Sequence, residues 1–324
     1  MTQAISAADS RLHWAGATSL DKTDDGVMPW RLHHRERTLY ALPLVERAAM
    51  PAGVRIVFRS DTTSLGAALN TWPERAPLDV VCDGALIATV ETADRASIHV
   101  DGLPAGDKQI ELWLPQFGEL RLSSLQIDDG ATLAAATPDH RPRWITYGSS
   151  ITQCRTAASP TQTWPAIVAR TCGYDLTCLG FGGQCHLDMM IARQMRDAAA
   201  DYLSMCVGIN IYGGGTLNPR TFGPSIIGFV QIVREKHPDT PFVVMSPIFS
   251  PPREDVFNSA GFTLRAMRDE VQAAVTALQA HGDRNVHYID GLTIFGPESA
   301  HLLPDDLHPD AKGYQLMGKI LWKR

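Results

Sequence analysis

The sequence predicts two domains: an all-β, jelly-roll-like sandwich over residues 1–138, then a three-layer α/β/α domain with a five-stranded parallel sheet over residues 139–324. Short apolar runs separated by turn residues fill the first part, as in an all-β domain. In the second part strand-like runs alternate with helical patterns, which is typical of a parallel sheet covered by helices. Between them, residues 131–142 have the composition of a linker.

The part before the linker consists mainly of short runs that predict strands. Asp83-Gly84 and Asp101-Gly102 are typical of tight turns between antiparallel strands. No long helical pattern occurs before residue 130, and the polar residues 1–25 predict little regular structure. The runs that predict strands are 54–59, 78–82, 96–100 and 109–114.

The part after the linker predicts alternating strands and helices. Apolar residues spaced by three and four between Leu264 and Leu278 predict an amphipathic helix. A second such pattern runs from Ile226 to Val233 and ends before His237-Pro238, and a third helix is expected near 311–321. In a parallel sheet of this kind the active site lies at the carboxyl ends of the strands. The predicted strands are 144–147, 175–179, 202–207, 242–246 and 286–290.

The bulk composition excludes several classes of partner. The net charge is −6 and no cluster of Lys and Arg stands out, which argues against a nucleic-acid or membrane-surface partner. The N-terminus has neither the basic nor the apolar region of a secretion signal, so a cytoplasmic protein is expected, with a trimmed signal left open. Six cysteines without metal-ligand spacing predict free buried thiols and no zinc site. Whether the chain forms a homo-oligomer stays open.

Two short motifs supply the roles of a serine hydrolase. The turn Gly148–Thr152 follows an apolar strand and can present the Ser150 hydroxyl at the top of the sheet. Near the C-terminus, His308 can act as the general base, and Asp305 can orient its ring. Asp306 and Asp310 are alternatives for that orienting role. Each motif by itself also fits an ordinary turn or helix start.

Two further turns can supply donors for an oxyanion. Gly180–Gln184 follows the second predicted strand, and glycines let the backbone point an N–H at a ligand. Gly208–Asn210 follows the third strand, where the Asn210 side-chain amide is another donor. A tight turn and a capping Asn are the alternatives. Taken together, four turns at one sheet edge each carry a residue that acyl transfer needs.

The combination resembles the SGNH hydrolase superfamily, also called the GDSL-type esterases, over about residues 143–322. The resemblance implies that Ser150 is the nucleophile, with Asp305 and His308 completing the triad. It also implies Gly183 and Asn210 as oxyanion donors beside the Ser150 N–H, with Gly182 an alternative to Gly183. Ser149 stands where the family name implies Asp. This variant is similar to a subgroup with an N-terminal β-sandwich that includes some carbohydrate O-acetyl esterases.

Three residues near the motifs are candidate substrate contacts. Arg155 follows the nucleophile turn and could bind a substrate carboxylate or hydroxyl, or form a surface salt bridge. Tyr212 follows Asn210 and belongs either to a pocket rim or to an ordinary loop. Glu254 ends a proline-rich stretch that leaves a strand at the same edge and suits a fixed pocket wall.

These features predict a serine esterase that hydrolyses short-chain acyl esters, acetyl above all, through an acyl-enzyme. The resemblance extends this to esters of a carbohydrate or a similar small molecule. Such chemistry requires no metal ion and no organic cofactor. Two alternatives remain open: an acyltransferase that uses the same site, and a carbohydrate-binding protein without catalytic activity.

Overall fold

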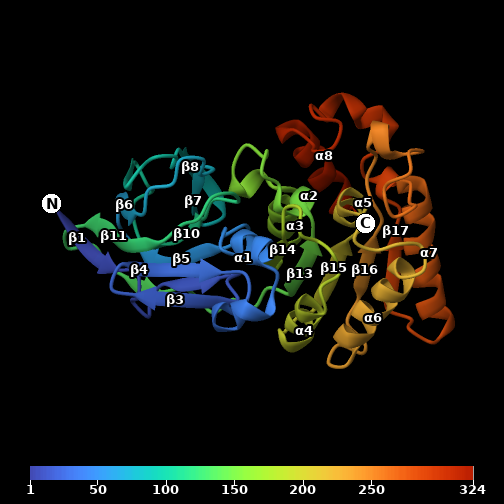
Figure 1. The fold of residues 1–324 in the computed structure, drawn as a ribbon. Coiled ribbons are helices and arrows are strands. Elements are labelled where there is room, and N and C mark those ends of the chain that lie inside the picture. Colours follow the sequence, from blue (N-terminus) through green and yellow to red (C-terminus); the bar gives the residue numbers. More distant parts are fainter. Residues whose placement is uncertain (324) are drawn as a thin grey trace.

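The computed structural model describes residues 1–323, which form an antiparallel β-domain followed by an α/β domain (Figure 1). The first domain contains two facing antiparallel sheets. The strands of the first sheet are β3 (Ser19–Thr23), β4 (Gly26–Trp30), β11 (Leu122–Asp128), β6 (Ser64–Leu69) and β9 (Ser97–Asp101), with β1 (Thr2–Ser6) paired to β11. The strands of the second sheet are β12 (Ala134–Ala135), β5 (Arg55–Ser60), β10 (Lys108–Trp113), β7 (Leu78–Cys82) and β8 (Ala85–Val90), with β2 (His13–Ala15) paired to β5.

The burial of alternate residues explains which strands of this domain the sequence predicts and which it does not. In β9, Ile98 and Val100 are buried and their neighbours are exposed, as the alternating pattern predicts. The expectation of little structure in residues 1–25 was wrong, because β1, β2 and β3 lie there. In β1 only Ile5 is buried, so the strand depends on its pairing with β11 and has no local apolar signal.

The second domain is a three-layer α/β/α unit around a parallel sheet, as the sequence predicts. All five predicted strands are present, and the first of them lies between the second and the third. This order places a topological switch point beside the first strand, where ligands bind in open α/β sheets. In sheet order the strands are β14 (Asp175–Gly180), β13 (Arg143–Gly148), β15 (Tyr202–Cys206), β16 (Phe242–Met245) and β17 (Val286–Ile289).

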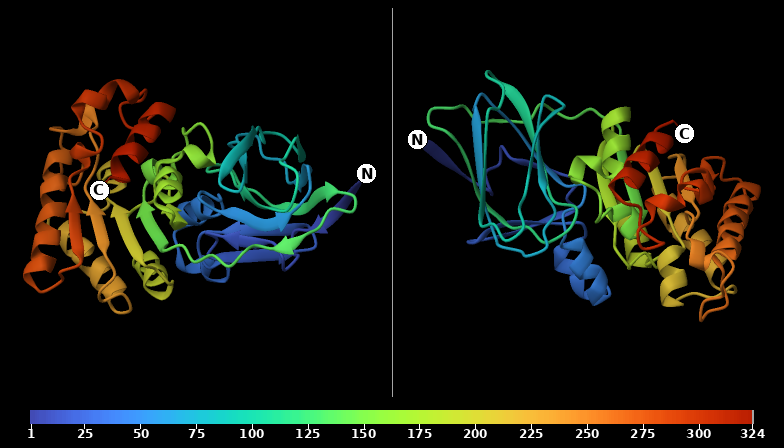
Figure 2. Two further views of the ribbon diagram at one scale, coloured as in Figure 1. Left: turned by 180° about the vertical axis from the view of Figure 1, so that it is seen from behind. Right: turned by 90° about the horizontal axis from the view of Figure 1, so that it is seen from above.

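Helices cover both faces of this sheet (Figures 1 and 2). On one face α3 (Trp164–Cys172) packs against α8 (Ala311–Leu321). The other face carries α4 (Met189–Asp197), α6 (Phe222–Arg234) and α7 (Leu264–Ala280), each in contact with the next. The shorter helices are α1 (Leu42–Ala48), α2 (Ser150–Gln153), α5 (Ile209–Gly214) and the 3-10 turns η1 (His34–Leu39), η2 (Pro160–Gln162), η3 (Pro251–Arg253), η4 (Gly291–Thr293) and η5 (Pro297–Leu302).

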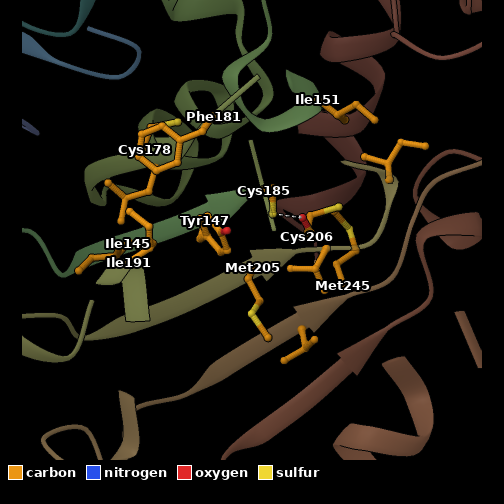
Figure 3. Close-up of a cluster of buried hydrophobic side chains, with 14 of the residues drawn as sticks. Ile145, Tyr147, Ile151, Cys178, Phe181, Cys185, Ile191, Met205, Cys206 and Met245 are labelled. Atoms are coloured by element: carbon orange, nitrogen blue, oxygen red, sulfur yellow. Dashed lines mark hydrogen bonds between the residues drawn. The ribbon is translucent and has the colours of Figure 1, made fainter. Parts of the chain in front are cut away.

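The core of the α/β domain packs along the parallel sheet, and Figure 3 shows some of its buried side chains. Tyr147 on β13 is fully buried, and its ring stacks on Phe229 of α6 with centroids 5.3 Å apart. The six cysteines are free thiols, and five of them are buried, as predicted, whereas Cys172 is partly exposed. Among residues 1–323, none of the helices has the length and apolar character needed to span a bilayer.

The two domains share a continuous interface. The core beneath the parallel sheet extends to Trp30 and Leu44 of the first domain. Buried hydrogen bonds also join the two domains. The Asp79 carboxylate on β7 accepts hydrogen bonds from the Ser159 hydroxyl and from the Thr161 N–H. Helix α1 lies at this junction, close to the end of β14 (Figure 1).

Candidate active site

Three neighbouring strand ends bring the predicted residues to one edge of the sheet. Gly148, the last residue of β13, pairs with Gly180 of β14 on one side and with Cys206 of β15 on the other. The segments that carry Ser150, Gly183 and Asn210 therefore leave the sheet side by side. The register explains why residues far apart in sequence meet here.

Ser150 begins helix α2 immediately after a tight turn. The Ser149 hydroxyl, which is completely buried, accepts a hydrogen bond from the Ile151 N–H at 3.2 Å and caps this helix. A Cβ at Gly148 would lie 2.1 Å from the Thr152 hydroxyl oxygen, so the turn requires glycine. The residue at the position of the family's Asp thus fixes the helix that presents the nucleophile.

A continuous chain of hydrogen bonds joins Ser150 to Asp305. The Ser150 hydroxyl oxygen lies 2.8 Å from His308 Nε2, and His308 Nδ1 lies 2.6 Å from a carboxylate oxygen of Asp305. The other Asp305 oxygen accepts the His308 backbone N–H at 2.7 Å. This is the arrangement of a nucleophile, a base and an orienting carboxylate.

Asp305 contacts the imidazole of His308, whereas the alternatives Asp306 and Asp310 have other roles. Asp310 caps α8 by accepting the Gly313 N–H at 2.8 Å. Asp306 has a φ of 57°, and its carbonyl accepts the Ser250 hydroxyl. Partial burial raises the pKa of Asp305, but the hydrogen bonds from His308 outweigh this effect and hold it below its ordinary value. Asp305 is therefore ionised at neutral pH and can stabilise a protonated His308.

The hydrogen bonds separate the two candidate glycines. The Gly182 N–H donates to the Gln153 side-chain oxygen at 2.8 Å and is occupied. The Gly183 N–H has no acceptor within residues 1–323, and Gly183 is exposed. Gly183 has a φ of 73°, which favours glycine. Of the two, Gly183 has the N–H that is available to an oxyanion.

The Asn210 side chain is oriented as a donor. Its carbonyl oxygen accepts the Cys185 N–H at 3.0 Å, which leaves the amide NH₂ without an acceptor in the part of the chain that the structure describes. The Ser150 N–H lies in the first turn of α2, where a backbone N–H has no partner within the helix. Three N–H donors are thus available at the strand ends, as an oxyanion hole requires.

The proline-rich loop after β16 supports the base rather than presenting free side chains. Glu254 is mostly buried, and its two carboxylate oxygens bind Arg268 at 2.7 and 2.8 Å. One of these oxygens also accepts the Ser250 N–H at 3.0 Å, and the Ser250 hydroxyl donates to the Asp306 carbonyl at 2.6 Å. The structure gives Glu254 these internal partners in place of the substrate contact suggested by the sequence.

The other two candidate substrate contacts also have protein partners. Arg155 pairs with Glu74 of the first domain at 2.9 Å, and its guanidinium lies 4.0 Å from the centroid of the Phe117 ring. This pair is exposed, as a surface salt bridge would be. The Tyr212 hydroxyl donates to the Val256 carbonyl at 2.9 Å and ties α5 to the following loop.

The His308–Asp305 pair is accessible from solvent. The side chains of His308 and Asp305 are 30% and 53% exposed. Ile151 and Leu307, which adjoin Ser150 and His308 in sequence, border an apolar region too tightly packed to admit a water molecule. Hollows of about 690 and 590 Å³ elsewhere are lined by other residues. Substrate therefore has to approach from the solvent side.

Two family models match the chain. The model of the SsfX3 N-terminal domain matches residues 12–123, and that of the GDSL-like lipase/acylhydrolase family matches residues 146–316. The second match covers more than half of the chain and includes the whole set from Ser150 to His308. The chain belongs to the GDSL-like lipase/acylhydrolase family.

Solved structures match the fold over nearly the whole chain. The salicylyl-acyltransferase SsfX3 from a tetracycline biosynthetic pathway is 38% identical, with a TM-score of 0.91 over 99% of this chain and 95% of that one. A putative GDSL-like lipase from Bacteroides ovatus ATCC 8483 is 20% identical, with a TM-score of 0.81 over 98% and 95%. A family two carbohydrate esterase from Clostridium thermocellum is 16% identical, with a TM-score of 0.70 over 96% and 97%. The last two likenesses show the fold alone. A comparison with curated protein sequences gives no match.

Sequence reasoning missed the residues that hold the GDSL-like site in place. Arg31 of the first domain donates to carbonyls at the end of β14, and Arg47 donates to the Gly182 carbonyl in the loop that follows. Neither belongs to a motif, and no spacing links them to residues 180–183. Gln153 is different, because its position three residues after Ser150, one helical turn away, already indicates from the sequence that it lies near the nucleophile.

Proposed function

We propose that this protein is a serine esterase that cleaves short-chain acyl esters through an acyl-enzyme on Ser150. The observation that carries the proposal is the hydrogen-bonded chain from Ser150 through His308 to Asp305. In the first step His308 Nε2 takes the Ser150 proton as the serine oxygen attacks the ester carbonyl. The resulting oxyanion accepts hydrogen bonds from the Gly183 and Ser150 N–H groups and from the Asn210 amide.

Collapse of this intermediate expels the alcohol, which takes the proton from His308. Water, deprotonated by the same imidazole, then attacks the acyl-enzyme, and the acid leaves as Ser150 recovers its proton. Asp305 remains ionised throughout and stabilises the transient imidazolium. These steps use only groups of this chain.

The acyl group we propose is short, acetyl above all. The packed apolar wall at Ile151 and Leu307 supports this choice, because it leaves no preformed channel for a long chain. The names of the carbohydrate esterases that share the fold, together with the open site, support a sugar or another polyol as the alcohol. These two choices fit an acetyl ester on a carbohydrate.

A second candidate function is acyl transfer to an alcohol, and one observation supports it. The relative named salicylyl-acyltransferase SsfX3 shares 38% identity over nearly the whole chain. The first half-reaction is the same in both cases, and only the acceptor of the second differs. Exclusion of water from the acyl-enzyme would favour transfer. The partial exposure of His308 favours hydrolysis, because water can reach the base.

Steady-state hydrolysis of p-nitrophenyl acetate, butyrate and octanoate by wild type and Ser150→Ala tests the proposal. We expect activity in wild type that falls with chain length and disappears in the variant, with unchanged circular dichroism. Added acceptor alcohols separate the two candidates: a transferase makes a new ester while p-nitrophenol release speeds up. Equal rates in wild type and Ser150→Ala would rule out Ser150 as the nucleophile.

A further inference from the structure

We propose that Arg47, a side chain of the β-domain, orients the Gly183 oxyanion donor of the α/β domain. The proposal rests on the proposed function, because an oxyanion forms here only when Ser150 attacks an ester. Arg47 lies in the last turn of α1, and its Nε–H donates to the Gly182 carbonyl at 3.2 Å. It acts through the peptide group and is therefore a positioning residue.

The hydrogen bond from Arg47 sets the direction of the Gly183 N–H. The Gly182 carbonyl and the Gly183 N–H belong to one planar trans peptide, in which the two groups point in opposite directions. A donor that fixes the oxygen thus also fixes the N–H. Hydrogen bonding to the oxygen further polarises the peptide and strengthens its N–H as a donor.

The peptide between Gly182 and Gly183 depends on a hydrogen bond from elsewhere for its orientation, because glycine has no side chain that could hold it. It joins two glycines, and a Cβ at Gly183 would meet nothing within 4 Å. Glycine accepts both signs of φ, so such a peptide can rotate at little cost. A rotation would turn the N–H away from the position of the oxyanion.

The backbone groups on either side of this peptide have other hydrogen-bond partners. Gln153 accepts the Gly182 N–H and is itself held by the Gln116 carbonyl of the β-domain at 3.1 Å. On the other side, His186 Nε2 lies 3.0 Å from the Gly183 carbonyl. Within residues 1–323, Arg47 is the donor to the oxygen between them. It therefore holds the peptide that carries the catalytic N–H.

The backbone of Arg47 is fixed by a second arginine. The guanidinium of Arg31 is fully buried and donates to the carbonyls of Arg47 and Gly180, and to that of Cys178 at 3.2 Å. Burial lowers the pKa of Arg31 to about 10, so it stays charged at neutral pH. The end of α1 and the end of β14 are thus joined through one buried cation.

The competing role for Arg47 is a direct contact with substrate. Its side chain is half-buried, and its terminal guanidinium nitrogens could reach a polar group on an ester. A substrate contact and an oriented donor have different kinetic signatures. Loss of binding shared by ground state and transition state raises KM, whereas loss of an interaction made only in the transition state lowers kcat.

Kinetics of Arg47→Met and Arg47→Lys on p-nitrophenyl acetate and butyrate test the proposal. Met keeps the apolar stem and removes the donor, and we expect kcat to fall about 10- to 100-fold with little change in KM. This is below the roughly 10²–10³-fold loss for deleting an oxyanion donor, because the Gly183 N–H remains present. Lys can still donate to the carbonyl and should recover part of the rate. The factor should be the same for both esters.

Arg170→Met is the matched control. Arg170 also crosses the domain boundary, donating to the Gly84 carbonyl at 3.0 Å, but it lies on α3 and outside the site. We expect its kcat and KM to match wild type. A rise in KM that differs between the two esters in Arg47→Met, or an unchanged kcat, would overturn the positioning role.

A measurement without turnover separates this proposal from the proposed function. In protein labelled with ¹⁵N-glycine, the Gly183 amide resonance reports the orientation and polarisation of its peptide. Arg47→Met should move that resonance while most other glycines keep theirs. An unmoved resonance refutes the inference even if Ser150 is an active nucleophile. A moved resonance in a protein that cleaves no ester supports the inference, while the proposed function fails.

Discussion

The two halves of the active site are held by different parts of the molecule. The oxyanion half, the end of β14 and the loop after it, is tied to the β-domain through Arg31, Arg47 and Gln153. The base half, from Asp305 to His308, is tied within the α/β domain through Ser250, which the Glu254–Arg268 pair supports. Among these contacts, the β-domain therefore helps to position the oxyanion half, whereas the base half is positioned within the α/β domain.

This difference shows how a site made of family motifs can depend on residues outside them. The motif residues supply the chemistry, and each lies at a strand end that the fold brings to one edge. Their orientation comes from long-range hydrogen bonds that differ between the halves. Damage to the β-domain should therefore impair oxyanion stabilisation, and damage to the loop after β16 should impair the base.

The largest effect should come from the base itself. His308→Ala removes the group that takes the Ser150 proton, and we expect kcat for p-nitrophenyl acetate to fall by at least about 10⁴-fold. His281→Ala, at the exposed end of α7, is the control and should match wild type. A His308→Ala variant with near-normal kcat would remove the base half from the mechanism.

The next effect should come from the oxyanion half. Asn210→Asp keeps an acceptor for the Cys185 N–H but places a carboxylate where the amide donor was. We expect kcat to fall about 10²–10³-fold, the usual loss when one such donor is removed. The comparison of kcat with KM on the acetate ester checks this. If only KM changes, Asn210 binds substrate and does not stabilise the oxyanion.

A smaller catalytic effect is expected from the support of the base loop. Glu254→Gln leaves the buried Arg268 without its charged partner, and we expect the free energy of unfolding to drop by about 3 kcal/mol. The kcat should fall because loss of the ion pair with Arg268 loosens the loop that carries Ser250, with KM little changed. Asp255→Asn is the matched control, since its pair with Arg265 is exposed to solvent and should contribute little to the free energy of unfolding. A change in KM alone would restore the substrate-contact role for Glu254.

The smallest effect concerns the charge on Asp305. Its pKa in the folded protein lies below the value of 3.8 for a free carboxyl group. The carboxylate thus stabilises the fold fully above about pH 4, and this contribution is lost as the pH falls through the lowered value. The side chain is half-exposed, so we expect less than about 1 kcal/mol.

Urea unfolding of wild type and Asp305→Asn between about pH 5 and about pH 3 measures this contribution. The difference in unfolding free energy should shrink towards the acid end. A difference that grows on acidification would contradict the lowered pKa of Asp305.

Much of the fold could be predicted because its signals are local. The five parallel strands are apolar runs, and α7 and α8 follow regular helical patterns, so each segment specifies its own structure. Strand β1 escaped prediction because its stability comes from pairing with β11, a partner far along the chain. The choice of Gly183 over Gly182 depends on which N–H is already occupied by Gln153. Arg47 lies beyond sequence reasoning because its partner is a backbone carbonyl, which leaves no pattern in side-chain types.

The most direct test of acyl transfer at Ser150 is to trap the covalent intermediate. Wild type, Asn210→Asp and Arg47→Met are mixed with p-nitrophenyl acetate, quenched in acid within one turnover, digested and examined by mass spectrometry. We predict an acetyl group on the peptide that contains Ser150, formed fast in wild type and more slowly in both oxyanion-half variants. Acetylation elsewhere, or ester cleavage without any acetylated Ser150 peptide, would contradict the account.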